Sequence, residues 1–346
     1  MRRTTGAARP AARTRTTAAA RPRTTRTTRT AGLTGLVAAA LLGPLLAGCT
    51  GGDGGGADDG GSGRHSRSPG ESARPAGPLL AVKVDNVGPA RPQAGLDAAD
   101  VVYAEQVEGG LSRLMAVFAT ELPEAVGPVR SARESDLELL RQFDDPTLAF
   151  SGAQHKLLPL IDKAPLRAAT PESAPDAYDR AKGRPAPHDL FLHPRALLKS
   201  APGADALTTG FTFGDAPSGG SPETDRTVRF PAARFAFAWS ADRHRWLVST
   251  DGRPTVTTDG TRVAPATVVV QYVTVRASRF HDYLGSTTPY TQTVGTGRAE
   301  VLRDGRAYEG HWKRDSATDG TKFTTADGAP LNFAKGQVWV VLAKKP

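Results

Sequence analysis

The stretch VVYAEQVEGGLSRLMAVFAT, residues 101–120, decides the fold of this chain. Two runs rich in β-branched and apolar residues lie on either side of Gly109-Gly110. Glycine accepts the positive φ angles of tight turns, so a glycine pair between two such runs is typical of a β-hairpin. The sequence therefore predicts two antiparallel strands joined at these glycines. Glu105 and Glu108 lie three residues apart before the turn, and a regular strand would direct them to opposite faces.

The segments around this hairpin predict further strands and short helices. Upstream, PLLAVKVDN (residues 78–86) alternates in character and predicts a strand that ends at Asp85-Asn86. Downstream, the pattern predicts a helix over 131–145, a buried strand over 146–153, a second helix over 153–164, and a Pro-rich loop leading into a third helix over 184–201.

The character of the chain changes at Thr227. Runs such as ATVVVQYVTV are rich in β-branched and aromatic residues, and five Asp-Gly pairs supply hairpin-turn chemistry. We expect the fold class to be α+β, with a layered β/β/α N-terminal half and a mainly antiparallel β C-terminal half.

The N-terminus of the chain predicts export and lipidation. Residues 1–48 carry nine Arg and no Asp or Glu, and the apolar run AGLTGLVAAALLGPLLAGC follows the arginines. This order is typical of a secretory signal, and Leu-Ala-Gly-Cys at its end resembles a bacterial lipobox. Cys49 is the only cysteine, which excludes disulfides and thiolate metal sites. We expect a lipid on Cys49 to anchor the protein at the outer face of the cytoplasmic membrane.

The charge distribution argues against a nucleic-acid partner. The whole chain has a formal net charge of +9, but the part after residue 48 has 35 basic and 35 acidic residues. No basic domain remains that could follow a phosphate backbone. Composition divides the chain into a signal peptide with lipobox (1–48), the lipidated Cys49 and a flexible tether (49–77), an α/β domain (78–200), a linker (201–226) and a β-rich domain (227–346).

The stretch GPVRSARESD, residues 127–136, contains two arginines that local structure does not explain. Ser131 and Glu134 form a Ser-x-x-Glu capping box, which predicts that a helix begins at Ser131. Arg130 and Arg133 would then lie at the positive end of the helix dipole, where a cation is unfavourable and an anion is favoured.

Two interpretations of this arginine pair are open. The anion could be internal, with Glu105 or Glu108 as partner, in a structural ion-pair cluster. It could also be an external carboxylate or phosphate ligand.

A wider set of polar residues in the first half makes up the candidate ligand-binding site. They follow strand ends and loops, where binding sites usually lie. The candidates are Asp85, Asn86, Arg91, Gln93, Glu105, Glu108, Arg113, Arg130, Arg133 and His188.

Two functions fit this set of residues. The first is a non-catalytic envelope lipoprotein that binds an anionic or wall-derived ligand or a protein partner. The second is a cell-wall hydrolase that uses carboxylates of the first half. Unpaired carboxylates beside a cleft would favour the hydrolase, and carboxylates paired to arginine would favour binding. No catalytic residue can be assigned, and we expect no cofactor and no metal.

Several long stretches resemble one bacterial family. LLAVKVDN, ARPQAGL, ADVVYAEQVEGGLSRLMAVF, GPVRSAR and APHDL resemble the N-terminal half of the YerB-like lipoproteins, and VVVQYV, TGRAEVLRDGRAYEGHWKR and GQVWVVL resemble their C-terminal domain. The resemblance covers residues 78–343. It implies an envelope lipoprotein with a layered α/β fold, and it implies no established activity.

Overall fold

The hairpin predicted around Gly109-Gly110 is present. In the computed structural model, which describes residues 77–346 except Tyr283, strands β2 (Val101–Gln106) and β3 (Ser112–Phe118) pair antiparallel. The short 3-10 turn η2 (Glu108–Gly110) joins them, with positive φ angles at both glycines. A Cβ atom on Gly110 would lie 2.5 Å from the Cβ of Pro231, so both the φ angle and the close packing require glycine there.

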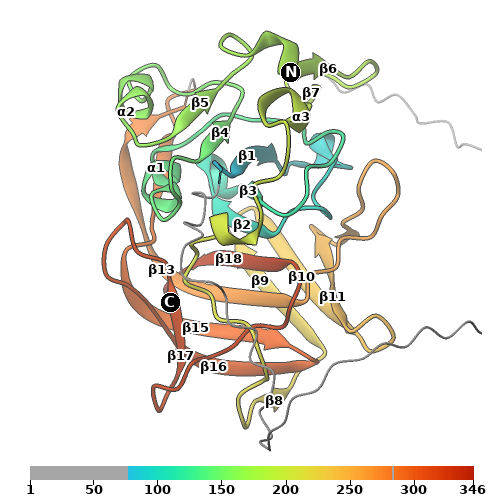
Figure 1. Ribbon diagram of the computed structural model, residues 1–346, viewed down its shortest axis with the longest axis vertical. Helices are drawn as coiled ribbons and strands as arrows, with labels where there is room; N and C mark the ends of the chain where they lie inside the picture. Colours follow the sequence, from blue (N-terminus) through green and yellow to red (C-terminus); the bar gives the residue numbers. More distant parts are fainter. Residues whose placement is uncertain (1–76, 283) are drawn as a thin grey trace, which may run out of the picture. The chain divides into compact units, whose positions relative to one another are not determined.

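One large sheet runs through both halves of the chain (Figure 1). In the N-terminal half, β1 (Leu80–Asp85) pairs antiparallel with β3 and parallel with β4 (Thr147–Ala149), and β5 (Arg167–Ala169) extends that edge. The last strand, β18 (Val338–Lys344), pairs parallel with β2 and thereby links the two halves.

The C-terminal half contributes the other strands of this sheet. β18 also pairs parallel with β13 (Thr267–His281), and every further pairing on that side is antiparallel. The remaining strands are β14 (Thr287–Gln292), β15 (Gly295–Arg303), β16 (Arg306–Arg314), β17 (Lys322–Thr325) and the two-residue β8 (Ser221–Pro222).

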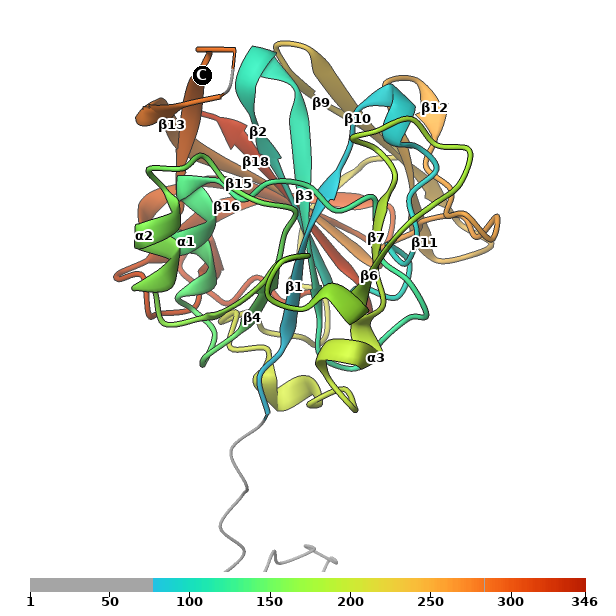
Figure 2. The ribbon, with the colours of Figure 1, turned by 90° about the horizontal axis from the view of Figure 1, so that it is seen from above.

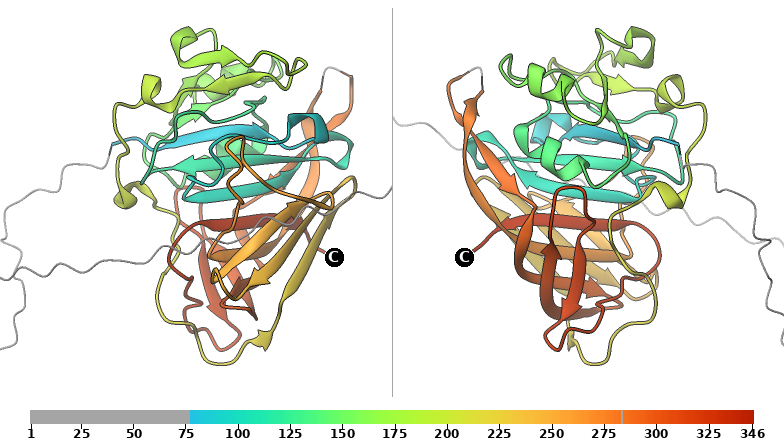
Figure 3. Two further views of the ribbon diagram at one scale, coloured as in Figure 1. Left: turned by 90° about the vertical axis from the view of Figure 1, so that its right-hand side faces the viewer. Right: turned by 60° about the vertical axis from the view of Figure 1, so that its left-hand side comes forward.

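A second sheet of four strands packs on one face of the large sheet. Its order is β12 (Arg253–Pro254), β11 (Arg245–Thr250), β10 (Ala233–Ser240) and β9 (Asp225–Phe230), and the left view of Figure 3 shows this sheet in yellow and light orange. Burial alternates along β10 and β11, as expected for strands with one face in a core. The ring centroids of Phe235 and Phe237 each lie 6.2 Å from that of the fully buried Trp339 in β18.

The opposite face of β1, β2 and β3 lies against helix α1 (Glu134–Leu140). Leu139 and Leu140 pack there with Tyr103 and Met115, in a second core cluster (Figure 2). Both core clusters lie within residues 77–346, which belong to one compact unit, so this part of the chain has its own hydrophobic core. No helix of this part is long and apolar enough to cross a membrane.

Side-chain alternation puts charged residues on the α1 face where the strands end. Asp85 and Glu105 are the cross-strand neighbours of Arg113 on its two sides, and Lys83 lies two residues before Asp85. These four residues therefore share one face of the sheet, next to the segment that leads into α1.

The predicted start of the first helix is wrong. α1 begins at Glu134, with Arg133 as its N-cap residue, and the side chain of Asp136 accepts a hydrogen bond of 2.6 Å from the Arg133 backbone N–H. The backbone before it is extended because it pairs elsewhere: Arg130 N–H donates to the Lys83 carbonyl at 2.8 Å, and Ala132 N–H to the Gly152 carbonyl at 3.0 Å. Tertiary pairing thus overrides the local capping signal.

The other predicted helices are present but shorter than expected. They are α2 (Leu158–Asp162) and α3 (Pro194–Leu197). The segment expected to be a Pro-rich loop contains β7 (Leu190–Leu192), which pairs with β6 (Tyr178–Arg180). The described chain is therefore rich in strands with a few short helices, consistent with the α+β class.

Candidate anion-binding site

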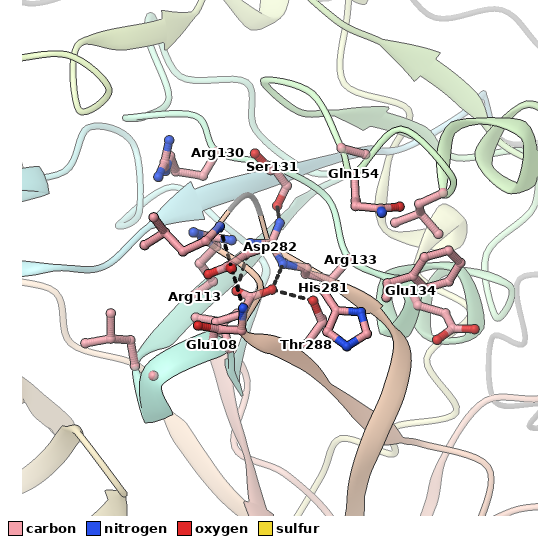
Figure 4. A pocket seen from close by; sticks show the side chains of 18 of the residues that line it. Glu108, Arg113, Arg130, Ser131, Arg133, Glu134, Gln154, His281, Asp282 and Thr288 are labelled. Carbon is pink, nitrogen blue, oxygen red and sulfur yellow. Dashed lines mark hydrogen bonds and ion pairs between the residues drawn. The ribbon is translucent and has the colours of Figure 1, made fainter.

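A pocket of about 720 Å³ opens where β1, β2 and β3 end. Its walls come from the N-terminal half and from the β13–β14 hairpin of the C-terminal half (Figure 4). The polar residues that line it are Glu108, Ser112, Arg113, Arg130, Ser131, Arg133, Glu134, Gln154, His155, His281, Asp282, Ser286 and Thr288.

Arg133 is fully engaged by an internal carboxylate. Its Nε and Nη2 donate to the two carboxylate oxygens of Glu108 at 2.7 and 2.8 Å, and its Nη1 donates to the Ala132 carbonyl at 3.1 Å. The Thr288 hydroxyl adds a bond of 2.5 Å to Glu108. Burial raises the pKa of Glu108, but the bonds and charge of Arg133 outweigh it and lower that pKa to about 2. Glu108 is therefore an anion at neutral pH.

The side chain of Arg130 forms an ion pair with a different carboxylate, that of Asp85. Its Nε lies 3.1 Å from Asp85 Oδ2, and the same oxygen lies 2.8 Å from His188 Nδ1. The Arg130 side chain is 21% exposed and lines the pocket. Within the described residues, no hydrogen bond engages its terminal nitrogens.

Arg113 lies deeper and has no partner among the residues that the structure describes. Its residue is 8% exposed, and both Nε and Nη1 are buried without a hydrogen bond. Burial lowers the pKa of Arg113 to about 10, and the charges of Arg133 and Arg130 contribute to this, against the opposing effect of Asp85 and Glu108. Arg113 is a buried cation in a cavity with unused donors.

Glu105 belongs to a separate buried ion cluster beneath the pocket. It pairs with the completely buried Lys83, whose Nζ also lies 2.7 Å from Asp136 Oδ1. Burial lowers the pKa of Lys83 to about 8, although Asp136 acts against this. Of the two carboxylates expected to meet the arginine pair, only Glu108 does so.

Three other candidate residues form a hydrogen-bonded chain beside the pocket. Asn86 Nδ2 donates to Ser112 Oγ at 2.9 Å, and Gln93 Nε2 donates to Asn86 Oδ1 at 2.9 Å. Arg91 donates to the Asn86 carbonyl at 2.5 Å and pairs with Asp251. Arg91 and Gln93 line a second pocket of about 620 Å³.

The predicted site residues thus fall into three groups. Four of them line the arginine pocket: Glu108, Arg113, Arg130 and Arg133. Asp85 pairs with Arg130, and His188 contacts the same oxygen of Asp85. The other four, Asn86, Arg91, Gln93 and Glu105, lie outside the pocket.

Sequence reasoning missed the remaining walls of the pocket. Ser112, Ser131 and Gln154 are ordinary polar residues, and Thr288 lies far along the chain in β14. No local pattern connects β14 to the hairpin at residues 101–120, so only the fold brings them together. Among the residues described, no cluster of three or more His, Cys, Asp or Glu could hold a metal ion.

Comparison with known families assigns most of this chain. Residues 66–207 match the N-terminal domain, and residues 226–340 the C-terminal domain, of a family described as "Protein of unknown function (DUF3048)". The chain belongs to the YerB-like family. This confirms the resemblance seen in the sequence.

Two comparisons place this YerB-like chain beside individual proteins. It is 49% identical over 65 residues to "Putative lipoprotein YerB" of Bacillus subtilis (strain 168), and that match spans 19% of this chain and 20% of the relative's length. The crystal structure of YerB protein from Bacillus subtilis superposes with a TM-score of 0.63 at 22% identity, covering 77% of this chain and 90% of that one. The second similarity establishes a shared fold.

Proposed function

We propose that this YerB-like chain is an extracytoplasmic lipoprotein, anchored to the outer face of the cytoplasmic membrane, that binds an anionic ligand in its arginine pocket. The lipobox at Cys49 and the name of the Bacillus subtilis relative support anchoring through a lipid. Cys49 and the tether, 49–77, lie outside the described residues except for Gly77 at the end of the tether. The tether would carry the domains 78–200, in β/β/α layers, and 227–346, joined by the linker 201–226. The ligand would be a cell-wall component or an envelope protein that presents an anionic group.

The observation that carries this proposal is that Arg113 is buried and has no hydrogen-bond partner among the described residues. A buried charge is normally paired, and buried donors normally have acceptors. Arg113 has neither among the described residues, and it borders a cavity large enough for a small molecule. A ligand anion in the cavity would supply the missing acceptors and reverse the repulsion between Arg113 and its two neighbouring arginines.

The pairing of the carboxylates favours binding over hydrolysis. Glu108 is bonded to Arg133, Glu105 to Lys83, and Asp85 to Arg130. A general acid needs a proton to donate near neutral pH, and the lowered pKa of Glu108 removes that ability. The two other lining carboxylates are also hydrogen-bonded: Glu134 accepts a bond of 2.5 Å from the Ser278 hydroxyl, and Asp282 accepts bonds of 2.9 and 2.7 Å from the backbone N–H groups of Leu284 and Ser286.

The proposal can be tested by thermal-shift measurements on residues 78–346 with acetate, inorganic phosphate, sulfate and glutamate. At least one anion is expected to raise the unfolding midpoint of the parent protein. Arg113→Gln should abolish that increase, whereas Arg195→Gln, which removes the same charge from an exposed helix position, should retain it. An increase of equal size in Arg113→Gln would place anion binding elsewhere.

A further inference from the structure

We infer that the ligand of the arginine pocket is an amphiphilic monocarboxylate: one carboxylate group attached to an apolar body. This inference rests on the proposed function and specifies its ligand. Three features of the pocket carry it, namely its free donors, its charge and its mouth.

The free donors of the pocket converge from two arginines. Arg133 is engaged by Glu108 and by the Ala132 carbonyl, so it has little to offer a ligand. Among the described residues, Arg113 has two buried nitrogens without acceptors, and Arg130, whose terminal nitrogens make no hydrogen bond there, lines the same cavity. The carboxylate therefore belongs between Arg113 and Arg130, with Glu108 left in place.

The charges around the pocket favour a ligand with one negative charge over a ligand with two. Among the described lining residues, the three cations Arg113, Arg130 and Arg133 are matched by three carboxylates, Glu108, Glu134 and Asp282. The buried cluster beneath contains Lys83 and two carboxylates, so it has one negative charge in excess. A second negative charge on the ligand would be repelled by this excess, and no further Arg or Lys among the described lining residues would balance it.

This charge balance favours a carboxylate over a phosphate monoester. A phosphate monoester carries close to two charges at neutral pH, whereas a carboxylate carries one. The pocket already contains a carboxylate held by two parallel N–H bonds, that of Glu108 on Arg133. A guanidinium fork suits a carboxylate in this way, and Arg113 still has such a fork free.

Exposed apolar side chains lie at the mouth of the pocket. Within the part of the chain that is described, three large hydrophobic side chains are exposed, and two of them, Leu111 (38%) and Leu284 (74%), line this pocket. Leu157 and Phe280 continue the apolar wall inward. Exposed apolar side chains gathered around an ionic centre suit a ligand with an apolar body behind its charged group.

The inference is tested by titration calorimetry on residues 78–346 with acetate, butanoate, hexanoate, octanoate, hexyl phosphate and 1-octanol. Affinity is expected to rise about fourfold for each methylene that becomes buried. Leu111→Ser should flatten this dependence on chain length and leave acetate binding unchanged. Arg113→Gln should weaken every carboxylate at least tenfold, and Arg195→Gln should match the parent. Octanol and hexyl phosphate should each bind more weakly than octanoate and hexanoate, respectively.

The contrary outcomes separate this inference from the proposed function. Carboxylates that bind through Arg113 with equal affinity at all chain lengths would overturn the apolar body and leave anion binding intact. Tighter binding of hexyl phosphate than of hexanoate would overturn the carboxylate assignment alone. Octanol that binds as tightly as octanoate would show that charge is not recognised. Failure of every anion to bind would overturn the proposed function itself.

Discussion

Replacing Arg113 with methionine is expected to stabilise the free protein, although Arg113 lies at the centre of the proposed site. Methionine replaces the aliphatic part of the side chain and removes the charge and the donors that have no acceptor among the described residues. Burial and the neighbouring arginines lower the pKa of Arg113 from its usual value to about 10. A lowering of this size corresponds to about 3 kcal/mol. Because the charged form is the disfavoured one, the whole penalty is present at pH 7 and would be relieved only above pH 10.

The matched variant is Arg133→Met, which makes the same substitution in the same pocket. It leaves the buried carboxylate of Glu108 without its bidentate partner. Removing one partner of a buried ion pair typically destabilises a protein by about 3–5 kcal/mol. The two variants should therefore shift stability in opposite directions: Arg113→Met up by about 1–3 kcal/mol, and Arg133→Met down.

Equilibrium unfolding in urea at pH 7, followed by tryptophan fluorescence, measures both variants against the parent. The midpoint should move to higher urea for Arg113→Met with an unchanged slope, since the surface exposed on unfolding hardly changes. If Arg113→Met loses as much stability as Arg133→Met, Arg113 is a member of a structural ion cluster and its lack of partners does not indicate a ligand.

Four further predictions concern other parts of the chain. Glu108→Gln should lower the thermal midpoint at pH 7 and flatten its decline between about pH 4.5 and pH 2, because the stability from a carboxylate of lowered pKa is lost only as pH falls toward that pKa; an unchanged profile would contradict the Arg133 pairing. Cys49→Ala should leave the protein unprocessed or released from the membrane, and fractionation and mass identical to the parent would exclude lipidation there. Deleting most of residues 50–77 should leave the unfolding midpoint unchanged, because that composition lacks the apolar residues to fold, and a large loss would show that the segment packs on the domains. Gly110→Ala should destabilise by about 1–3 kcal/mol, since its φ of +72° and its contact with Pro231 both exclude a Cβ; a neutral result in urea unfolding would contradict that packing.

The parts of the fold that could be predicted are those where local chemistry and tertiary structure agree. The glycine pair specified the hairpin, and the alternation over 78–86 specified β1. The helix start at Ser131 could not be predicted, because the backbone from Val129 to Ala132 pairs with β1 and with Gly152 and is therefore extended. A capping signal predicts a helix start only where the backbone is free to become helical, and the backbone at Ser131 is held extended by these pairings.

The candidate site was predictable where a residue conflicted with its local surroundings. Arg130 and Arg133 could be recognised as cations beside a predicted helix start, and Glu108 was one of the two carboxylates, with Glu105, predicted as their partner. What distinguishes Arg113 is the absence of acceptors around it within the described residues, which depends on side chains from three strands and a distant hairpin. The lack of acceptors around a side chain depends on how distant segments pack, so no residue spacing in the sequence predicts it.

The most direct test of a ligand anion at Arg113 is anomalous diffraction from crystals of residues 78–346 soaked with 4-bromobenzoate, a monocarboxylate with an apolar ring. We expect a bromine peak at the mouth of the pocket near Leu111, with the carboxylate within hydrogen-bond distance of Arg113 and Arg130 and with the Glu108–Arg133 pair intact. A fully soaked crystal with no bromine in this pocket, or with the carboxylate bound away from Arg113, would contradict this expectation.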